Sequence, residues 1–314
     1  MSMKTLLAVA LMLTSTSTWS ETLFINDATV HTMGIRTVMQ DADVLIRDGK
    51  VQNLGVDLEA PADATMIEAD GRPLTPGLFA GITEHGLVEI SMVESSADGT
   101  LGGTEMRPEF DVTPAYNPWT SSIPVTRIEG LTWALLGAAQ KGSIIGGQGQ
   151  AVTFDGAYSS FMGNKVLFVS IGAGASEKSA GSRAAQWMLL EQALSEANSN
   201  LEWQPGSLLT PNGRLALKSF LDDGLVIFAA DRASDILQVL NFAKKHQLNT
   251  AIAGGVEAWK VADELANAGV PVLLNPMVNL PGNFDQLGAR LDNAALLHEA
   301  GVTIGFTGAG TNNA

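Results

Sequence analysis

A carboxylate and an imidazole stand side by side at the end of a predicted buried strand. The strand begins at Leu78, and Thr83-Glu84-His85 follows it, with Glu89 close behind. In barrels of parallel strands the active site lies at the carboxyl ends of the strands, where a Glu–His pair can perform acid–base catalysis. The same residues also fit a solvated loop with incidental charges, and the sequence leaves both interpretations open.

The composition limits the chemistry that these residues can join. The 314 residues contain no Cys, which removes disulfides, thiolate catalysis and Cys-ligated metal centres. The four His residues are His31, His85, His246 and His298, and only His85 is near the predicted strand end. Since 33 acidic and 18 basic residues give a net charge of −15, nucleic-acid binding is not expected. A hydrophobic content of 46% supplies a large core.

Three familiar motifs are incomplete. A predicted strand runs into Gly172-Ala173-Gly174, but the third Gly of a dinucleotide fingerprint is replaced by Glu177. The segment Gly146–Gln150 lacks the Lys-Ser/Thr pair of a P-loop, and we predict a tight loop there. No Gly-x-Ser-x-Gly elbow of a serine hydrolase is present.

The N-terminus has the layout of a secretory signal peptide. A positive start at Lys4 precedes the apolar run Leu6–Leu13, and small polar residues lead to Ser20. We therefore predict a signal peptide over residues 1–20 and a periplasmic or secreted protein. No later segment offers 18 uninterrupted apolar residues, so no membrane association is expected.

Residues 21–75 are predicted to form a small antiparallel β-sheet, one half of a composite sandwich. Short strands are expected over 22–25, 29–32, 43–47, 51–54 and 66–68. Asp48-Gly49 separates two of them and is a strong hairpin signal.

Residues 76–314 are predicted to form a TIM-type (β/α)8 barrel, so the fold class is α/β. Helices are expected over 179–197, 212–221, 233–246, 256–268 and 287–300. Gly269 and Gly301 each end a helix, and a β-branched strand follows each. Strands that recur every 20–30 residues with helices between them favour a parallel sheet with right-handed crossovers.

Several segments, taken in their order along the chain, match a known pattern. They are Ala69-Asp70-Gly71 with Leu74–Phe79, Asn117-Pro118 with Ile123–Arg127, Ala230–Ile236, Gly255–Trp259 and Leu297–Val302. Together they resemble the imidazolonepropionase-like branch of the amidohydrolase superfamily, over essentially all of 21–314. The resemblance implies hydrolysis of C–N bonds, often in cyclic amides or peptide-like substrates, by a divalent metal such as zinc that activates water.

The metal ligands of that family do not carry over. The resemblance implies ligands at His-x-His after strand 1, a Lys on strand 4, His on strands 5 and 6, and Asp on strand 8. The corresponding positions are Ile82-Thr83-Glu84, Ala229 with Asp231 nearby, Gly254 and the segment 307–310, and no Lys stands out. One His with Glu84 and Asp231 is a poor zinc set. We therefore expect no metal cofactor, and a family activity that is lost or severely weakened.

Six residues remain as candidates at the site. Glu84, His85 and Asp231 are the catalytic candidates, and the matched segments add Asn117, Arg127 and Arg232 as substrate-binding candidates. The first hypothesis is a C–N hydrolase with an unusual site. The second is a non-catalytic protein that binds an amide-like small molecule or pairs with an active homologue. A carbohydrate-active barrel with Glu84 and Asp231 as its two carboxylates is a weaker third.

The resemblance also implies a last helix and further strands beyond the eighth barrel strand, whereas this chain stops at Ala314. We therefore expect a barrel that lacks its closing segment. Uncovered apolar surface and open edges favour association, so a homo-oligomer or a hetero-oligomer with an amidohydrolase is expected.

Overall fold

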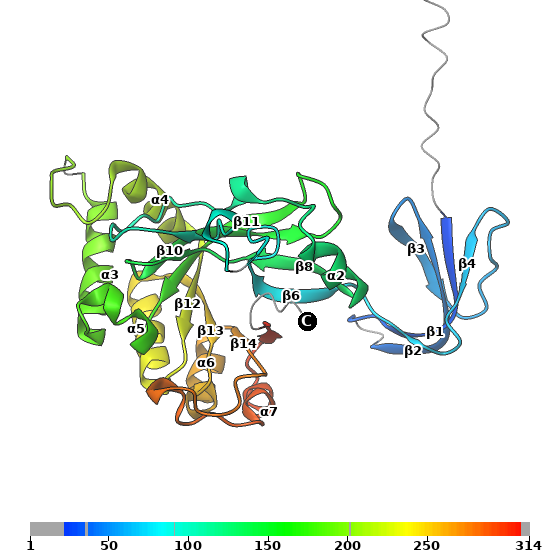
Figure 1. Cartoon of the computed structure of the whole chain (residues 1–314). Helices are drawn as coiled ribbons and strands as arrows, with labels where there is room; N and C mark the ends of the chain where they lie inside the picture. Colours follow the sequence, from blue (N-terminus) through cyan, green and yellow to red (C-terminus); the bar gives the residue numbers. More distant parts are fainter. Residues whose placement is uncertain (1–21, 35–36, 91, 201, 309–314) are drawn as a thin grey trace, which may run out of the picture. The chain divides into compact units, whose positions relative to one another are not determined.

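The computed structural model describes residues 22–34, 37–90, 92–200 and 202–308 (Figure 1). The predicted signal peptide lies outside these residues. The chain divides into two compact units, with the boundary between Pro76 and Gly77. Each unit is described by itself.

The first unit is a five-stranded sheet with the order β3-β2-β1-β4, and β5 also pairs with β1. Its strands are β1 (Thr22–His31), β2 (Val38–Arg47), β3 (Lys50–Gly55), β4 (Thr65–Glu68) and β5 (Pro73–Leu74). The hairpin predicted at Asp48-Gly49 is confirmed, since both residues have a positive φ and Arg47 pairs with Lys50. The expectation of a purely antiparallel sheet is wrong, because β4 and β5 run parallel to β1. A small core of Ala28, Val30, Ala42, Val44 and Ala69 holds this unit together.

The second unit is built on an eight-stranded sheet that nearly closes into a barrel. Its strands, in spatial order, are β6 (Leu78–Thr83), β8 (Leu131–Leu136), β10 (Ile145–Thr153), β11 (Phe161–Ser170), β12 (Leu225–Ala230), β13 (Asn249–Gly254), β14 (Val272–Leu274) and β15 (Ile304–Phe306). A separate two-stranded sheet pairs β7 (Thr100–Leu101) with β9 (Ala139–Gln140). At the seam Thr307 Oγ1 accepts a hydrogen bond of 2.9 Å from the Ile82 amide, which links the end of β15 to β6.

The expectation of an all-parallel barrel sheet is wrong at one strand. β10 runs antiparallel to both β8 and β11, whereas β11 through β15 are mutually parallel. The connections 137–144 and 154–160 explain this, because they are shorter than the dozen or so residues that a parallel crossover needs. The segment Gly146–Gln150, predicted to be a loop, lies inside β10.

The glycines of β10 allow a close backbone approach. A Cβ atom at Gly149 would lie 1.8 Å from the carbonyl oxygen of Leu136, and one at Gly146 would lie 2.5 Å from that of Ala138. Since a backbone carbonyl cannot swing away as the end of a flexible side chain can, both positions favour glycine.

Helices connect the parallel strands and cover the outside of the sheet (Figure 1). The α-helices are α2 (Ser122–Ile128), α3 (Arg183–Asn198), α4 (Pro211–Asp222), α5 (Ala233–His246), α6 (Ala262–Ala268) and α7 (Asn293–Glu299). The 3-10 helices are η1 (Glu94–Ser96), η2 (Thr113–Ala115), η3 (Ala173–Ala175), η4 (Glu177–Ser179), η5 (Ala258–Val261) and η6 (Phe284–Gln286). The glycine helix ends are confirmed, with φ of +64° at Gly269 and +85° at Gly301. The helix expected over 287–300 starts later, because Gly288 bonds to Glu257 instead of continuing a helix.

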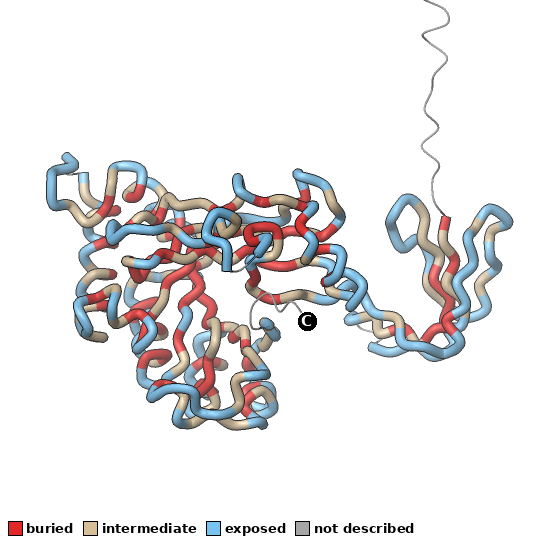
Figure 2. The backbone as a smooth tube through the Cα atoms, viewed as in Figure 1, coloured by how far each residue is buried: buried red, intermediate tan, exposed pale blue. Residues whose placement is uncertain are grey.

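The barrel unit has its main core between the helices and strands β11–β14. Leu190 of α3, Ile236 and Val239 of α5, and Leu265 of α6 are buried against strand residues such as Phe228. Figure 2 shows the buried strands at the centre of this unit and exposed residues in the connections. Among the described residues, no helix is long and apolar enough to cross a membrane.

We predict that Gly149→Ala destabilises the barrel unit by at least about 2 kcal/mol, because the new Cβ overlaps the Leu136 carbonyl. Gly102→Ala is the matched control, since a Cβ there meets nothing within 4 Å, and its effect should stay within about 0.5 kcal/mol. Urea unfolding followed by tryptophan fluorescence measures both. Equal unfolding midpoints for the two variants would contradict the close packing of β10.

Candidate functional site

A cavity of about 350 Å³ lies at the carboxyl ends of β11, β12 and β13. This is the end of the sheet at which barrels with this connectivity carry their sites. The wall residues are mostly small, and polar and apolar atoms contribute about equally to the wall surface. It consists of Ser170, Ile171, Gly174, Ala175, Ala229, Ala230, Asp231, Ala253, Gly254, Asn283 and Asp285.

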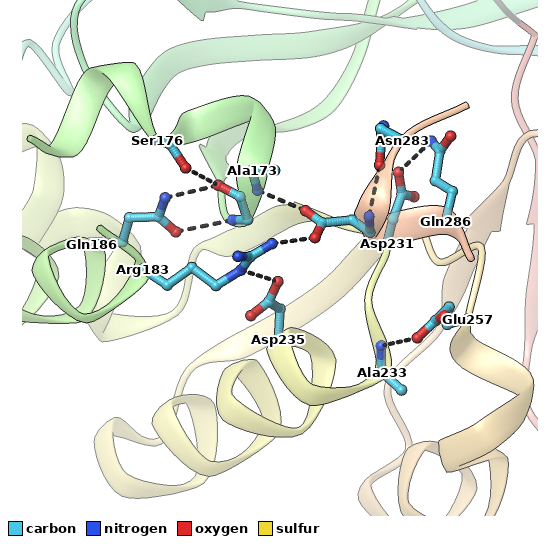
Figure 3. A network of polar contacts seen from close by, with 12 residues as sticks. Ala173, Ser176, Arg183, Gln186, Asp231, Ala233, Asp235, Glu257, Asn283 and Gln286 are labelled. Carbon is cyan, nitrogen blue, oxygen red and sulfur yellow. Dashed lines mark hydrogen bonds and ion pairs between the residues drawn. The ribbon is translucent and has the colours of Figure 1, made fainter. Parts of the chain in front are cut away.

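Asp231 directly follows β12 and presents its carboxylate to this cavity. Its Oδ2 atom accepts a hydrogen bond of 2.8 Å from the Gln286 side chain (Figure 3). Its Oδ1 atom lies 3.5 Å from the Val256 amide. A Cβ at Gly254 would lie 2.5 Å from Oδ1, so the glycine at the end of β13 makes room for the carboxylate. A carboxylate has about four acceptor positions, which leaves capacity for a ligand.

The surroundings of Asp231 favour its protonated form. Burial raises the pKa of Asp231 above its ordinary value, and the negative charges of Asp285 and Glu257 raise it further. The hydrogen bonds from Gln286 and Val256 act in the opposite direction and do not cancel the rise in the pKa. A half-buried carboxylate with a raised pKa in a cavity marks a candidate functional group.

Arg183 at the start of α3 holds the neighbouring carboxylates in place. It pairs with Asp235 of α5 at 3.0 Å and, in a second contact, with Asp285 of η6 (Figure 3). Both carboxylates are buried, and Asp285 also accepts a hydrogen bond of 2.6 Å from the Ala173 amide. One guanidinium therefore ties together three segments that surround the cavity.

The turn after β11 is fixed by a buried amide. Gln186 of α3 accepts from the Gly172 amide at 2.9 Å and donates to the Gly172 carbonyl at 2.8 Å. Gly172 has a φ of +104°, and a Cβ there would lie 2.9 Å from Asp285. The Gly-rich turn thus lets backbone approach the Asp285 carboxylate, and Glu177 lies in the short helix that follows.

Glu257 lies beside Asp231, whose carbonyl accepts a hydrogen bond of 2.8 Å from the Glu257 amide. It is buried and accepts hydrogen bonds from Lys260 and from the amides of Ala233 and Gly288. Burial alone would raise the pKa of Glu257, but these hydrogen bonds outweigh burial and lower it. The Glu257 carboxylate therefore already accepts hydrogen bonds from within the protein, whereas the Asp231 carboxylate can accept further hydrogen bonds from a ligand.

Of the six candidates from the sequence, Asp231 alone lines the cavity. Glu84 is exposed and lies against Gly99. The His85 ring contacts Phe154 and lies 3.3 Å from Thr126 of α2, and burial lowers its pKa. No hydrogen bond or ion pair joins Glu84 or His85 to Asp231, although all three are among the described residues.

The three substrate-binding candidates lie elsewhere. Asn117 donates to Glu89 at 3.0 Å, and Arg127 donates to the Phe154 carbonyl at 3.0 Å. Arg232 is the exposed N-cap of α5 and is absent from the cavity wall. Their roles toward a ligand remain predictions.

The donor set does not fit the metal that the resemblance implies. The positions corresponding to the strand-5 and strand-6 ligands, Ala229 and Gly254, have no donor side chain and form cavity wall. Thr307 uses its hydroxyl at the barrel seam. Within the described part of the chain, no group of three or more His, Asp or Glu residues is placed to hold a metal ion.

The sequence analysis missed Arg183, Gln186, Asp285 and Gln286. A usable signal existed for the turn at Gly172, because it follows a buried strand and therefore lies at the end of the sheet where sites form. No local pattern marked Asp285, whose partner Arg183 is 102 residues away in the sequence.

Comparison of structures finds the same fold in an amidohydrolase from Thermotoga maritima. The TM-score is 0.77 at 21% sequence identity, over 91% of this chain and 78% of the other. Two further structures are a prolidase complexed with N-methylphosphonate-L-proline (TM-score 0.49, 11% identity, 91% and 78% covered) and a triazine hydrolase from Arthrobacter aurescens (0.47, 14%, 92% and 72%). Of these three structures, the Thermotoga maritima amidohydrolase alone has a TM-score above 0.5, and at 21% identity the likeness concerns the fold. No family model and no curated protein sequence matches the chain.

We predict that Asp231→Asn becomes progressively more stable than the wild type as the pH rises from 3.8 through the raised pKa of folded Asp231. The raised pKa means that the folded wild type binds this proton more tightly than the unfolded chain, so its stability falls as the pH rises from 3.8 through the folded pKa. The Asn side chain has no such proton. Urea unfolding at a series of pH values measures the difference.

Asp292→Asn is the matched control with the opposite sign. The ion pair with Arg290 lowers the pKa of Asp292, so the wild type gains stability with rising pH that the variant lacks. A stability difference for Asp231→Asn that stays constant or shrinks with rising pH would show that the carboxylate is not held in an unfavourable site.

Proposed function

We propose that this protein uses an amidohydrolase-like barrel to bind a small molecule that presents N–H groups, as amines and amides do, to Asp231. The observation that carries the proposal is a half-buried carboxylate with spare acceptor capacity in a cavity of about 350 Å³. That volume is at the lower end of the range for small-molecule sites.

The cavity wall leaves room for a small ligand that carries both apolar and polar groups. Apart from Asp231 the wall is made largely of alanine and glycine, among them Ala229, Ala230, Ala253 and Gly254. Asp285 also contributes, but its charge is paired with Arg183. The net charge of −15 attracts cations and repels anions at long range, which favours an amine over a carboxylic acid.

A destabilising carboxylate at this position also supports a role in function. Burial of a charged group without a full set of partners lowers stability, and sites that bind ligands commonly retain such groups. A structural role would be met as well by an amide, which could keep the bond to Gln286.

The finer assignment follows the sequence resemblance. The order of the matched segments supports an imidazolonepropionase-like origin, and the replaced ligand positions Ala229 and Gly254 support loss of the metal. The signal-peptide pattern supports a periplasmic or secreted location. The alternative function is C–N hydrolysis at an unusual site, for which the fold likeness to an amidohydrolase is the supporting observation.

We predict that benzylamine and benzamide bind the purified chain and that benzoate does not. Asp231→Asn should weaken benzylamine binding by about 10- to 100-fold, the usual effect of removing a charged hydrogen-bond partner. Asp263→Asn, a carboxylate on the exposed face of α6, is the control and should leave the affinity unchanged. Isothermal titration calorimetry measures the affinity of the wild type for each of the three compounds and the affinity of both variants for benzylamine. Equal binding to wild type and Asp231→Asn would refute the role of this carboxylate.

The hydrolase alternative is separated by a metal and activity measurement on the same preparation. The binding proposal expects no stoichiometric zinc after purification and no hydrolysis of amide substrates. A stoichiometric divalent metal, together with chelator-sensitive hydrolysis that Glu84→Ala/His85→Ala abolishes, would support the alternative and contradict the binding proposal.

A further inference from the structure

Two large aromatic side chains of the barrel unit are exposed and lie against each other. Trp119 is 72% exposed and Tyr158 is 62% exposed. Their ring centroids are 5.6 Å apart, with an angle of 51° between the ring planes, so the two rings form one continuous surface. Tryptophan is highly buried on average, and exposed apolar surface of this kind commonly marks a binding site. We call Trp119 and Tyr158 the aromatic platform.

Hydrogen bonds hold Trp119 in its exposed position. Its indole Nε1 donates to the Gly156 carbonyl at 3.2 Å, in the connection that carries Tyr158. Its backbone amide donates to the side-chain oxygen of Asn117 at 3.1 Å, and the Asn117 amide group donates to Glu89 at 3.0 Å. Asn117, a substrate-binding candidate from the sequence, therefore positions Trp119. Because the N–H edge of the indole is bonded within the protein, the rest of the ring stays open to a ligand.

The connection between β10 and β11, which carries Tyr158, is also held in one conformation. The Asp155 carboxylate accepts hydrogen bonds of 2.9 Å from the Thr153 hydroxyl and from the Ala157 amide. It accepts a third from the Ser160 hydroxyl, so the bonds span the connection from one end to the other. A surface that is already ordered loses little conformational entropy when a ligand binds.

The aromatic platform and the cavity lie at opposite ends of the sheet. Tyr158 lies just before β11, which begins at Phe161, whereas Ser170 at the carboxyl end of β11 lines the cavity. A strand of ten residues spans about 30 Å. The aromatic platform is therefore a separate site, and what it binds does not depend on the function proposed for the cavity.

Three classes of ligand pack on exposed aromatic rings. They are nucleobases, organic cations and sugars, whose pyranose rings present a flat face of C–H groups. The net charge of −15 repels polynucleotides, which disfavours the first class.

The local charges favour a neutral sugar over a cation. The connection between β10 and β11 contains one acidic residue, Asp155, and this carboxylate already accepts three hydrogen bonds from within the protein. Arg127 donates to the Phe154 carbonyl at 3.0 Å and so brings a positive charge to the start of the same connection. A cation gains most from ring faces on several sides, whereas these two rings contact each other and leave no gap between them.

We infer that the aromatic platform binds a neutral oligosaccharide, with its pyranose rings stacked on Trp119 and Tyr158. Two adjoining aromatic rings are longer than one pyranose ring, so two consecutive sugar units cover them. The hydroxyl groups of Tyr158 and the neighbouring Ser159 belong to exposed residues and can exchange hydrogen bonds with sugar hydroxyls.

Isothermal titration calorimetry of the full chain with cellopentaose and with maltopentaose tests the inference. We expect saturable binding of at least one of them at millimolar concentration or below, and no binding of sorbitol, which has hydroxyl groups but no ring. Trp119→Ala should weaken the binding by at least about 10-fold, because it removes the larger stacking surface. Tyr158→Phe keeps the ring and should stay within about 3-fold of the wild type, whereas Tyr158→Ala should weaken the binding. Circular dichroism checks that the variants remain folded.

Trp203→Ala is the matched control, because Trp203 is an exposed tryptophan in the connection between α3 and α4. This variant should bind the oligosaccharide as the wild type does. Failure of both oligosaccharides to bind at millimolar concentration would overturn the inference, and so would equal losses in Trp119→Ala and Trp203→Ala. If tetramethylammonium or phosphatidylcholine vesicles bind through Trp119 while the oligosaccharides do not, the aromatic platform recognises a cation or a membrane surface and the inference is wrong.

Discussion

The mouth of the barrel depends on the pairing of Arg183 with two buried carboxylates. Asp235 starts α5 and Asp285 lies in the connection between β14 and α7, so the guanidinium joins segments that the sheet alone would leave apart. Without it, two buried negative charges would face each other, which is strongly destabilising. The pairing fixes the position of η6, and η6 in turn places Gln286 against Asp231. The geometry of the candidate site therefore depends on the positive charge of Arg183.

The barrel shares its fold with an amidohydrolase structure, and its cavity is lined mainly by small residues. Small residues at the ends of β12 and β13 leave space where a metal cluster would need donors, and Asp231 projects into that space. Burial raises the pKa of this carboxyl. A cationic or N–H-bearing ligand would stabilise the charged carboxylate and so lower its pKa again. Fold likeness indicates the scaffold, whereas the function must be argued from these side chains.

Local signals predicted the second half of the barrel well and the site poorly. Helical periodicity and the glycines at Gly269 and Gly301 indicated the repeating units, since their effect is confined to a few residues. β10 was missed because its glycines suggest a loop, whereas here they admit the Leu136 carbonyl of the neighbouring strand. Asp231 became a candidate through the resemblance of the segment Ala230–Ile236 to a strand end of the family. Its partner Gln286 is 55 residues away in the sequence, and no periodic pattern connects such distant residues.

The central claim is that Asp231 is a half-buried carboxylate with unused acceptor positions, and that an N–H-bearing ligand donates hydrogen bonds to them. Its own titration tests this most directly, by carbon-13 NMR of the Asp231 carboxyl in the free protein and in protein saturated with benzylamine. The account predicts a pKa above 3.8 in the free protein and a lower pKa in the complex, because the ligand stabilises the charged form. A pKa at or below 3.8 in the free protein, or one that benzylamine leaves unchanged, would contradict it.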